Sequence, residues 1–269
     1  MATRPRTASR GSATAHAAPH AMFLHGAGAW GGQWAIWRRA FEAEGWRTAA
    51  PDRQPSSGGL AATRFDDHVA QCVDALASMS VAAGPTEDRV APVLIGASLG
   101  GLLALAVAAS RAGSGAGPSA SRPTAPRALI LVNPLPPAPW ARELPPRVID
   151  GDVVPWHSQG RFASTVRAMP GAAFTDRRHA FHHWRDESAA LLREAQAGVP
   201  LPAPDVPVLV IASDADADVP PSLSAAFAKA IGASFATVAG GHVEPVMGAS
   251  AAHAATLAMA WLEASAPAR

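Results

Sequence analysis

Residues 93–101 read Val-Leu-Ile-Gly-Ala-Ser-Leu-Gly-Gly and decide the fold of this chain. An apolar run typical of a buried strand passes into Gly-x-Ser-x-Gly, and a helical stretch of small residues follows at 102–109. This order predicts a sharp strand-to-helix turn, a nucleophile elbow, that exposes the Ser98 hydroxyl at the edge of a sheet. Because the helix directs its N-terminus at the serine, its free N–H groups can stabilise negative charge there.

Strand and helix patterns alternate along most of the chain. Apolar runs typical of strands lie at 21–24, 46–50, 93–95, 128–132, 208–211 and 234–238. Helices are expected at 31–43, 65–79, 222–230 and 250–264. Continuous apolar strands that alternate with helices predict an α/β fold, with a mainly parallel sheet of about six strands flanked by helices.

Residues 134–204 interrupt this alternation. They begin with a proline-rich stretch, and helices are expected at 160–168 and 177–197. Because the segment follows the carboxyl end of a strand, where ligands bind in open α/β folds, we interpret it as a helical lid. The predicted organisation is a disordered tail at 1–20, an α/β core at 21–133 and 205–269, and a lid subdomain at 134–204.

The composition argues against several classes of protein. A net charge of +1 over 269 residues gives no electrostatic reason to expect nucleic acid or an anionic membrane as a partner. No apolar run is long enough to span a bilayer. Cys72 is the single cysteine, and the first twenty residues lack the apolar region of a secretory signal, so we expect a cytoplasmic protein without disulfides. The oligomeric state stays open.

A serine nucleophile needs a base, and the base needs an orienting acid. The strand predicted at 208–211 leads into three spaced aspartates: Asp214, Asp216 and Asp218. His242 follows the last predicted strand, after two glycines that permit close approach. The order serine, aspartate, histidine is the one expected on this type of scaffold.

Together with the stretch Leu-His-Gly-Ala-Gly-Ala-Trp at 24–30, these segments resemble the α/β-hydrolase superfamily. The closest resemblance is to small esterases with a lid, a group that includes plant methylesterases and hydroxynitrile lyases. It extends from Ala21 to Leu262 and is weakest in the lid. It implies the α/β-hydrolase fold, with Ser98 as nucleophile and His242 as general base and later general acid.

The resemblance also points to an acid, because the family's aspartate usually stands three residues before a Val-Pro pair. That position is Asp216 here, although Ser213 replaces the usual glycine of the motif. Asp214 and Asp218 remain alternatives. By the same resemblance, the backbone N–H groups of Ala27 and Leu99 form the oxyanion hole.

Several side chains near these motifs have more than one interpretation. His25 is expected to shape its loop by hydrogen bonding rather than to act as the base, and Glu244 either tunes His242 or faces solvent. Three lid tryptophans are candidates for an apolar substrate wall or for lid packing: Trp140, Trp156 and Trp184. Three lid histidines fit a partly exposed helix better than a metal site: His179, His182 and His183. We therefore expect neither a metal nor a cofactor.

These residues predict a carboxylesterase-like serine hydrolase that cleaves a carboxylic ester of a small or medium apolar compound through an acyl-enzyme. A small-molecule ester and water are then its partners. A thioesterase, a lactonase or a C–C hydrolase would use the same triad. A hydroxynitrile lyase would by resemblance need a lysine near the leaving cyanide, and Lys229, in a predicted helix beyond the acid loop, is the single lysine. A non-catalytic receptor for a small ligand also stays open.

Overall fold

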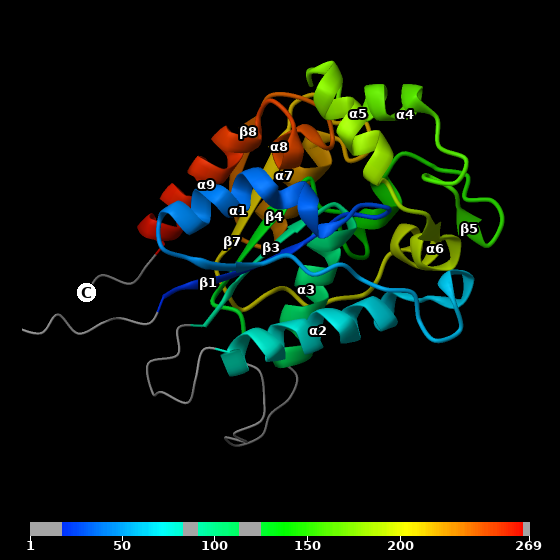
Figure 1. Cartoon of the computed structure of the whole chain (residues 1–269). Helices are drawn as coiled ribbons and strands as arrows, with labels where there is room; N and C mark the ends of the chain where they lie inside the picture. Colours follow the sequence, from blue (N-terminus) through cyan, green and yellow to red (C-terminus); the bar gives the residue numbers. More distant parts are fainter. Residues whose placement is uncertain (1–17, 83–90, 113–124, 266–269) are drawn as a thin grey trace, which may run out of the picture.

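One parallel sheet of six strands organises the molecule (Figure 1), whose computed structural model describes residues 18–82, 91–112 and 125–265. The strands are β1 (His20–Leu24), β2 (Arg47–Ala49), β3 (Val93–Ala97), β4 (Ala128–Val132), β7 (Val208–Ser213) and β8 (Ser234–Val238). Their order across the sheet is β2-β1-β3-β4-β7-β8. The predicted parallel sheet is therefore confirmed. Most of the predicted tail lies outside the described residues, and β1 begins at His20.

The strands are apolar on both faces because helices cover both faces. On one face, Met22 and Leu24 of β1 belong to a core that includes residues of four helices: α2 (Phe65–Ala82), α3 (Leu99–Ala112), α6 (Ala189–Ala197) and α7 (Pro221–Ala230). On the other face, Ala21 and Phe23 pack with residues of helices α1 (Ala35–Ala43) and α9 (Ala251–Ala264). In Figure 1, α1 and α9 lie on the opposite side of the sheet from α2 and α3. Period-two alternation thus directs successive side chains into two different cores.

The helices that cover the sheet agree with the sequence periodicity. They are α1 (Ala35–Ala43), α2 (Phe65–Ala82), α3 (Leu99–Ala112), α7 (Pro221–Ala230), α8 (Glu244–Met247) and α9 (Ala251–Ala264), with short 3-10 turns η1 (Gly31–Trp34) and η2 (Leu60–Ala62). Trp34, Trp37 and Phe41 are fully buried around Phe23, as the helical spacing predicts. The Trp37 indole N–H donates to the Pro245 carbonyl at 2.7 Å, which joins α1 to α8.

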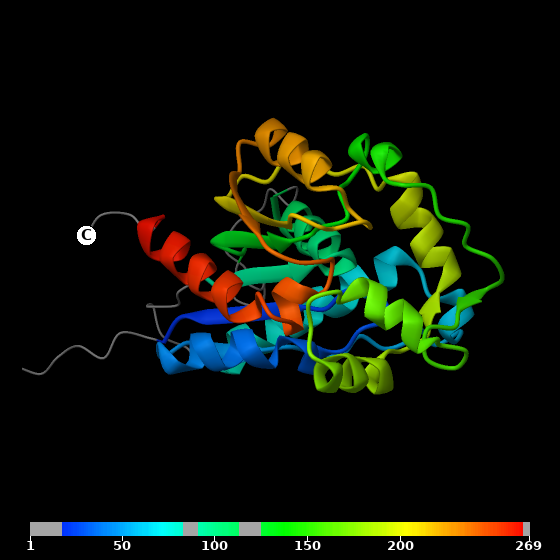
Figure 2. The ribbon, with the colours of Figure 1, turned by 90° about the horizontal axis from the view of Figure 1, so that it is seen from above.

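Residues 134–204, which we call the insertion, gather beyond one end of the sheet (Figures 1 and 2). The insertion contains η3 (Trp140–Glu143), β5 (Val153–Val154), α4 (Phe162–Ala168), α5 (Phe174–His183), β6 (Glu187–Ser188) and α6 (Ala189–Ala197). Strands β5 and β6 pair in antiparallel orientation.

The prediction of one continuous helix at 177–197 is wrong. Helix α5 ends at His183, and the backbone of Trp184 is already extended, with ψ 150°. A new helix, α6, begins where the Ser188 hydroxyl accepts a hydrogen bond from the Leu191 N–H. In the gap, Arg185 and Glu187 bond to the loop after β1. A helical pattern in the sequence cannot reveal such long-range partners, which interrupt the helix here.

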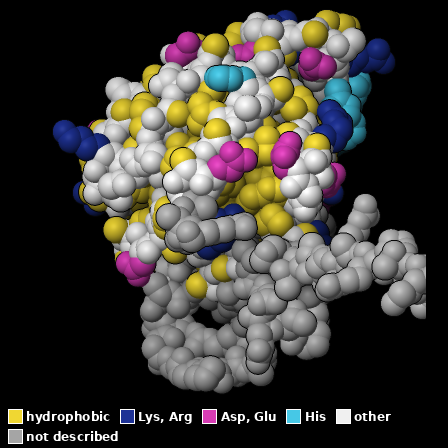
Figure 3. All heavy atoms as spheres, turned by 90° about the vertical axis from the view of Figure 1, so that its left-hand side faces the viewer, with side chains coloured by type: hydrophobic (Ala, Val, Ile, Leu, Met, Phe, Trp, Pro, Cys, Tyr) yellow, Lys and Arg dark blue, Asp and Glu magenta, His cyan; other side chains and the backbone are white. Residues whose placement is uncertain are grey.

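The described surface agrees with the near-neutral composition. On the face drawn in Figure 3, acidic and basic side chains are scattered among hydrophobic and uncharged ones. Within the described ranges, no helix combines the length and the apolar character that crossing a membrane requires.

Candidate active site

Ser98 occupies the turn between β3 and α3 with an unusual backbone. Its φ is +52°, in the left-handed region that costs a non-glycine residue about 1–3 kcal/mol. The Ser98 N–H donates to the Val132 carbonyl at 3.0 Å, and its carbonyl accepts the Leu135 N–H at 3.0 Å. The end of β4 and the start of the insertion therefore hold this turn in place.

Glycines surround Ser98 because backbone segments pass very close to one another there. A Cβ on Gly96 would lie 2.2 Å from the Gly100 carbonyl oxygen, and a Cβ on Gly100 would lie 2.1 Å from that of Leu24. A Cβ on Gly26 would lie 3.4 Å from the Ser98 Cβ. The loop after β1 thus runs directly beside the serine side chain.

Leu99 follows Ser98 directly in the chain, and Gly26, the residue before Ala27, lies against the Ser98 side chain. Leu99 is the first residue of α3, where an N–H has no partner inside the helix. No hydrogen bond in the described part of the chain uses the Ala27 N–H. Both donors are therefore free for an oxyanion formed at Ser98.

His242 contacts one of the three aspartates. Its Nδ1 lies 2.7 Å from Asp216 Oδ2, and the Asp216 side chain is fully buried. The other oxygen, Oδ1, accepts the N–H groups of Asp218 at 2.8 Å and Val219 at 3.0 Å, which fixes the carboxylate. Asp214 instead accepts the Gly240 N–H at 2.9 Å.

The environment of His242 favours its protonated form. Burial alone would lower its pKa, but the charge of Asp216 and the hydrogen bond that this carboxylate accepts outweigh burial. The pKa of His242 is therefore raised above its ordinary value. The charge of Asp218 raises this pKa further, whereas the charge of Arg147, the ion-pair partner of Asp218 in the insertion, lowers it.

The described residues show no hydrogen bond between the side chains of Ser98 and His242. In ligand-free sites such a contact is often long, and it tightens only when substrate binds. The sequence motifs thus supply an aspartate–histidine pair and a serine elbow at the same end of the sheet.

Asn133, which the sequence motifs did not reveal, connects the end of β4 to Ser213 at the end of β7 and to His242 after β8. Its amide nitrogen donates to Ser213 Oγ and to the His242 carbonyl, each at 2.8 Å, and its amide oxygen accepts the Ser213 N–H at 2.7 Å. Its φ is +43°. The Asn-Pro pair that ends β4 was the available signal, because asparagine tolerates this backbone region. Ser213 stands where the resembled family usually has glycine, and its Oγ accepts one of the bonds from Asn133.

Two other uncertain side chains are now placed. Glu244 is buried, and its Oε2 accepts the Gly241 N–H at 2.5 Å, so the interpretation that it faces solvent is wrong. His25 is buried as well, and its Nδ1 lies 2.8 Å from the Gly26 carbonyl oxygen. Burial, and next the charge of Arg53, lower the pKa of His25 well below its usual value. A neutral His25 shapes its loop, as expected.

The three predicted wall tryptophans separate into two groups. Trp140 and Trp156 pack against the core that includes Leu99 and Ala27, and a Cβ on Gly28 would lie 2.2 Å from the Trp156 ring. Trp184 packs against Met169, Val243 and Met247, and its ring meets Trp30 edge to face with the centroids 5.9 Å apart. Trp156 therefore lies against Gly28 of the loop after β1, whereas Trp184 lies against Trp30 at the end of that loop.

The histidines of α5 form ring contacts. His183 stacks on Trp30 with the ring centroids 5.0 Å apart, and His179 lies 4.2 Å from His183 by the same measure. Among the described residues, no group of three histidine, cysteine or acidic side chains is arranged to hold a metal ion.

Comparison with known proteins identifies the family. The sequence matches the alpha/beta hydrolase family over residues 21–258, so the chain belongs to that family. No curated protein sequence matches it significantly.

Solved structures with the same fold include polyneuridine aldehyde esterase, which is 14% identical, with 93% of this chain and 100% of that protein covered and a TM-score of 0.67. An extracellular α/β-hydrolase from a Paenibacillus species, described as homologous to tobacco salicylic acid binding protein 2, is 15% identical, with coverages of 90% and 98% and a TM-score of 0.67. A thermophilic esterase from Thermogutta terrifontis is 19% identical, with coverages of 91% and 90% and a TM-score of 0.64. At these identities the likeness establishes the fold, and the predicted resemblance to the methylesterase group is confirmed.

Proposed function

We propose that the protein is a serine hydrolase that cleaves carboxylic esters of small or medium apolar compounds. The proposal depends most on one contact, the 2.7 Å hydrogen bond between His242 Nδ1 and the buried Asp216. This bond fixes the tautomer that leaves Nε2 free to accept a proton. The strained Ser98 elbow and the free Ala27 N–H support the same chemistry.

In this mechanism Ser98 Oγ attacks the ester carbonyl carbon while its proton passes to His242 Nε2. The Ala27 and Leu99 N–H groups stabilise the tetrahedral oxyanion. His242 then gives its proton to the leaving alcohol, and the C–O bond breaks to leave an acyl-enzyme. Water attacks that intermediate, His242 again accepts and returns a proton, and the carboxylic acid departs.

We also propose that the insertion is a lid over this site and that Trp140, Trp156 and Trp184 contribute to a substrate wall. Backbone bonds from Leu135 to Ser98, from Arg185 to Gly28 and from Val243 to Ala168 support this placement. The structural neighbours described as esterases also favour a small ester as substrate.

A hydroxynitrile lyase is disfavoured by the position of Lys229. This lysine is exposed near the end of α7, on the segment between β7 and β8. Hydrolysis of a thioester or a lactone would use the same triad and oxyanion donors. Rates measured on a panel of esters, thioesters and lactones therefore decide among these substrates.

The first test uses p-nitrophenyl acetate and butyrate with purified protein. We expect turnover by the wild type and a loss of at least about 10³-fold in kcat for Ser98→Ala, because the nucleophile is absent. Ser78→Ala is the matched control, since Ser78 is exposed on α2 and bonds within its own helix to the Asp74 carbonyl. Full activity in Ser98→Ala would refute the mechanism. Tight ligand binding without any ester turnover would favour a receptor.

A further inference from the structure

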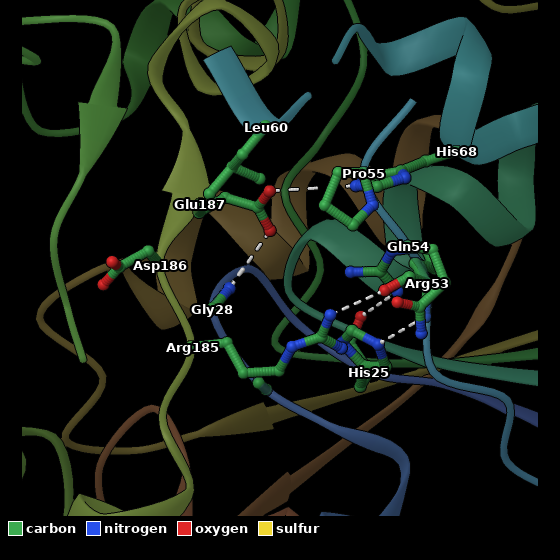
Figure 4. Close-up of a pocket in the computed structure, with 11 residues that line it drawn as sticks. His25, Gly28, Arg53, Gln54, Pro55, Leu60, His68, Arg185, Asp186 and Glu187 are labelled. Atoms are coloured by element: carbon green, nitrogen blue, oxygen red, sulfur yellow. Dashed lines mark hydrogen bonds and ion pairs between the residues drawn. The ribbon is translucent and has the colours of Figure 1, made fainter. Parts of the chain in front are cut away.

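Arg53, which follows β2, is almost completely buried, with 4% of its surface exposed. One terminal nitrogen donates to the carbonyl oxygen of His25 at 2.8 Å (Figure 4). The other donates to the carbonyl oxygen of Gly26 at 3.0 Å. His25 Nδ1 lies 2.8 Å from the same Gly26 oxygen, and His25 Nε2 lies 3.3 Å from the Arg53 backbone nitrogen. One buried cation therefore fixes two consecutive carbonyl groups of the loop after β1.

The Gly26 carbonyl belongs to the same peptide group as the Ala27 N–H. This peptide is trans and planar, so the carbonyl and the N–H point in opposite directions. Arg53 and His25 occupy the carbonyl side, which directs the N–H away from them. A positive charge at the carbonyl oxygen also polarises the amide, and this makes the Ala27 N–H a stronger donor.

A buried cation requires a counter-charge, and the insertion provides one. Glu187 of β6 is buried and lines a small polar cavity together with Arg53 and His68 (Figure 4). Burial would raise the pKa of the Glu187 carboxyl, but the nearby His68 imidazole, whose Nε2 lies 3.7 Å from Oε1, and the charge of Arg53 lower it overall. Glu187 is thus an anion at neutral pH and faces the Arg53 cation across this cavity.

The same part of the insertion binds both backbone polar groups of Gly28. Glu187 Oε2 accepts the Gly28 N–H at 3.1 Å, and the Arg185 N–H donates to the Gly28 carbonyl at 2.6 Å. The Arg185 guanidinium also donates to the Arg53 carbonyl at 2.9 Å. These contacts explain why the chain leaves the helical path between α5 and α6.

We propose that Arg53 is a positioning residue for the oxyanion hole, which orients and polarises the Gly26–Ala27 peptide, and that Glu187 of the insertion is its counter-ion and second anchor. This inference rests on the proposed function. It adds that the oxyanion donor becomes correctly placed only when the insertion is docked on the loop after β1.

The experiment compares Arg53→Met, which removes the charge, with Arg53→Lys, which keeps it. We expect Arg53→Met to lower kcat by about 10–100-fold while KM changes by less than about 2-fold, because only the transition state uses the oxyanion donor. Arg53→Lys should recover part of that loss. A phenylboronic acid, which forms an anionic tetrahedral adduct with the serine, should lose affinity for Arg53→Met by a similar factor.

Arg127→Met is the matched control for loss of a buried arginine. Arg127 is half-buried at the start of β4, stacks over Trp46 at 5.3 Å, and also has a buried Nε without a partner among the described residues. Arg127 precedes β4, whereas Asn133 follows it, so Arg127 lies at the opposite end of this strand from the candidate site. Arg127→Met is expected to lower the melting temperature with kcat unchanged.

Two outcomes overturn the inference about Arg53. One is a kcat for Arg53→Met within about 2-fold of the wild type, and the other is a lower kcat with undiminished boronate affinity. If Arg53→Met does not fold, Arg53→Lys and Glu187→Gln take its place in both measurements, and each is expected to lower kcat and boronate affinity together by at least about 3-fold.

Failure of the proposed function gives a different result. Ester hydrolysis that survives in Ser98→Ala refutes the serine mechanism itself, whatever Arg53 does. If no ester is a substrate, the rate at which a fluorophosphonate labels Ser98, followed by intact mass, still tests Arg53, because that reaction also develops negative charge on oxygen. A wild-type protein that is not labelled at all overturns both proposals.

Discussion

The hydrogen bond between His242 and Asp216 determines how the histidine behaves with pH. Asp216 is buried, accepts two backbone N–H groups and contacts His242, whereas Asp214 is bonded to Gly240. Asp216 therefore orients the imidazole and contributes most to stabilising its positive charge, and the charge of Asp218 adds to that effect. The raised pKa of His242 follows from this contact.

The pH dependence of activity tests this pair. His242 must be neutral to accept a proton, so kcat/KM should fall as the pH drops through its raised pKa, with a midpoint above about 6.5. Asp216→Asn should lower kcat by about 10³–10⁴-fold and move that midpoint to lower pH, because burial then acts without the opposing charge. Asp214→Asn is the control, and an equal loss in that variant would contradict the assignment. Rates of p-nitrophenyl butyrate hydrolysis from pH 5 to 9 measure both effects.

At the scale of elements, close approach between β1, β3 and α3 builds the serine turn. Gly96 and Gly100 are required because carbonyl oxygens lie within about 2.2 Å of where their Cβ atoms would be. The strain at Ser98 is held by bonds to Val132 and Leu135. The elbow is thus a product of three packed elements rather than of a local turn preference.

Gly100→Ala measures this close approach. In an open helix the change would stabilise by about 1 kcal/mol, since alanine has the better helix propensity. Here the added Cβ would lie 2.1 Å from the Leu24 oxygen, so we expect the free energy of unfolding to fall by about 3 kcal/mol. Gly232→Ala, at φ +67° with open space around it, should cost only about 1 kcal/mol. Equal urea midpoints for Gly100→Ala and the wild type would contradict the packing argument.

At the scale of the whole molecule, the insertion bonds to loops that come from three separate strands. It contacts Ser98 after β3, Gly28 after β1 and Val243 after β8. Its Trp156 ring lies against Gly28 of the loop after β1, whereas Trp184 contacts Trp30 and packs against Val243, which follows His242. The insertion therefore lies beside the candidate catalytic groups.

Trp156→Ala tests whether the insertion sets substrate size. Removal of this ring should enlarge the site, and each buried methylene contributes about 0.8 kcal/mol. We expect the kcat/KM preference for p-nitrophenyl octanoate over butyrate to rise by about 10-fold. Trp46→Ala, a change beside Phe41 and Arg127, should lower stability without altering this preference. An unchanged chain-length profile in Trp156→Ala would argue against a role in the substrate wall.

The sequence by itself determined the parallel sheet, the serine turn and the order of the chemical motifs. Continuous apolar strands and the glycine pattern around Ser98 are local properties, and hydrophobic burial and backbone sterics act on them directly. Only the tertiary structure decided which aspartate meets His242, where the helix predicted at 177–197 breaks, and that Asn133, Arg53 and Glu187 support the site. Those contacts join residues far apart in the chain, and their energies depend on burial and distance, which no local pattern encodes.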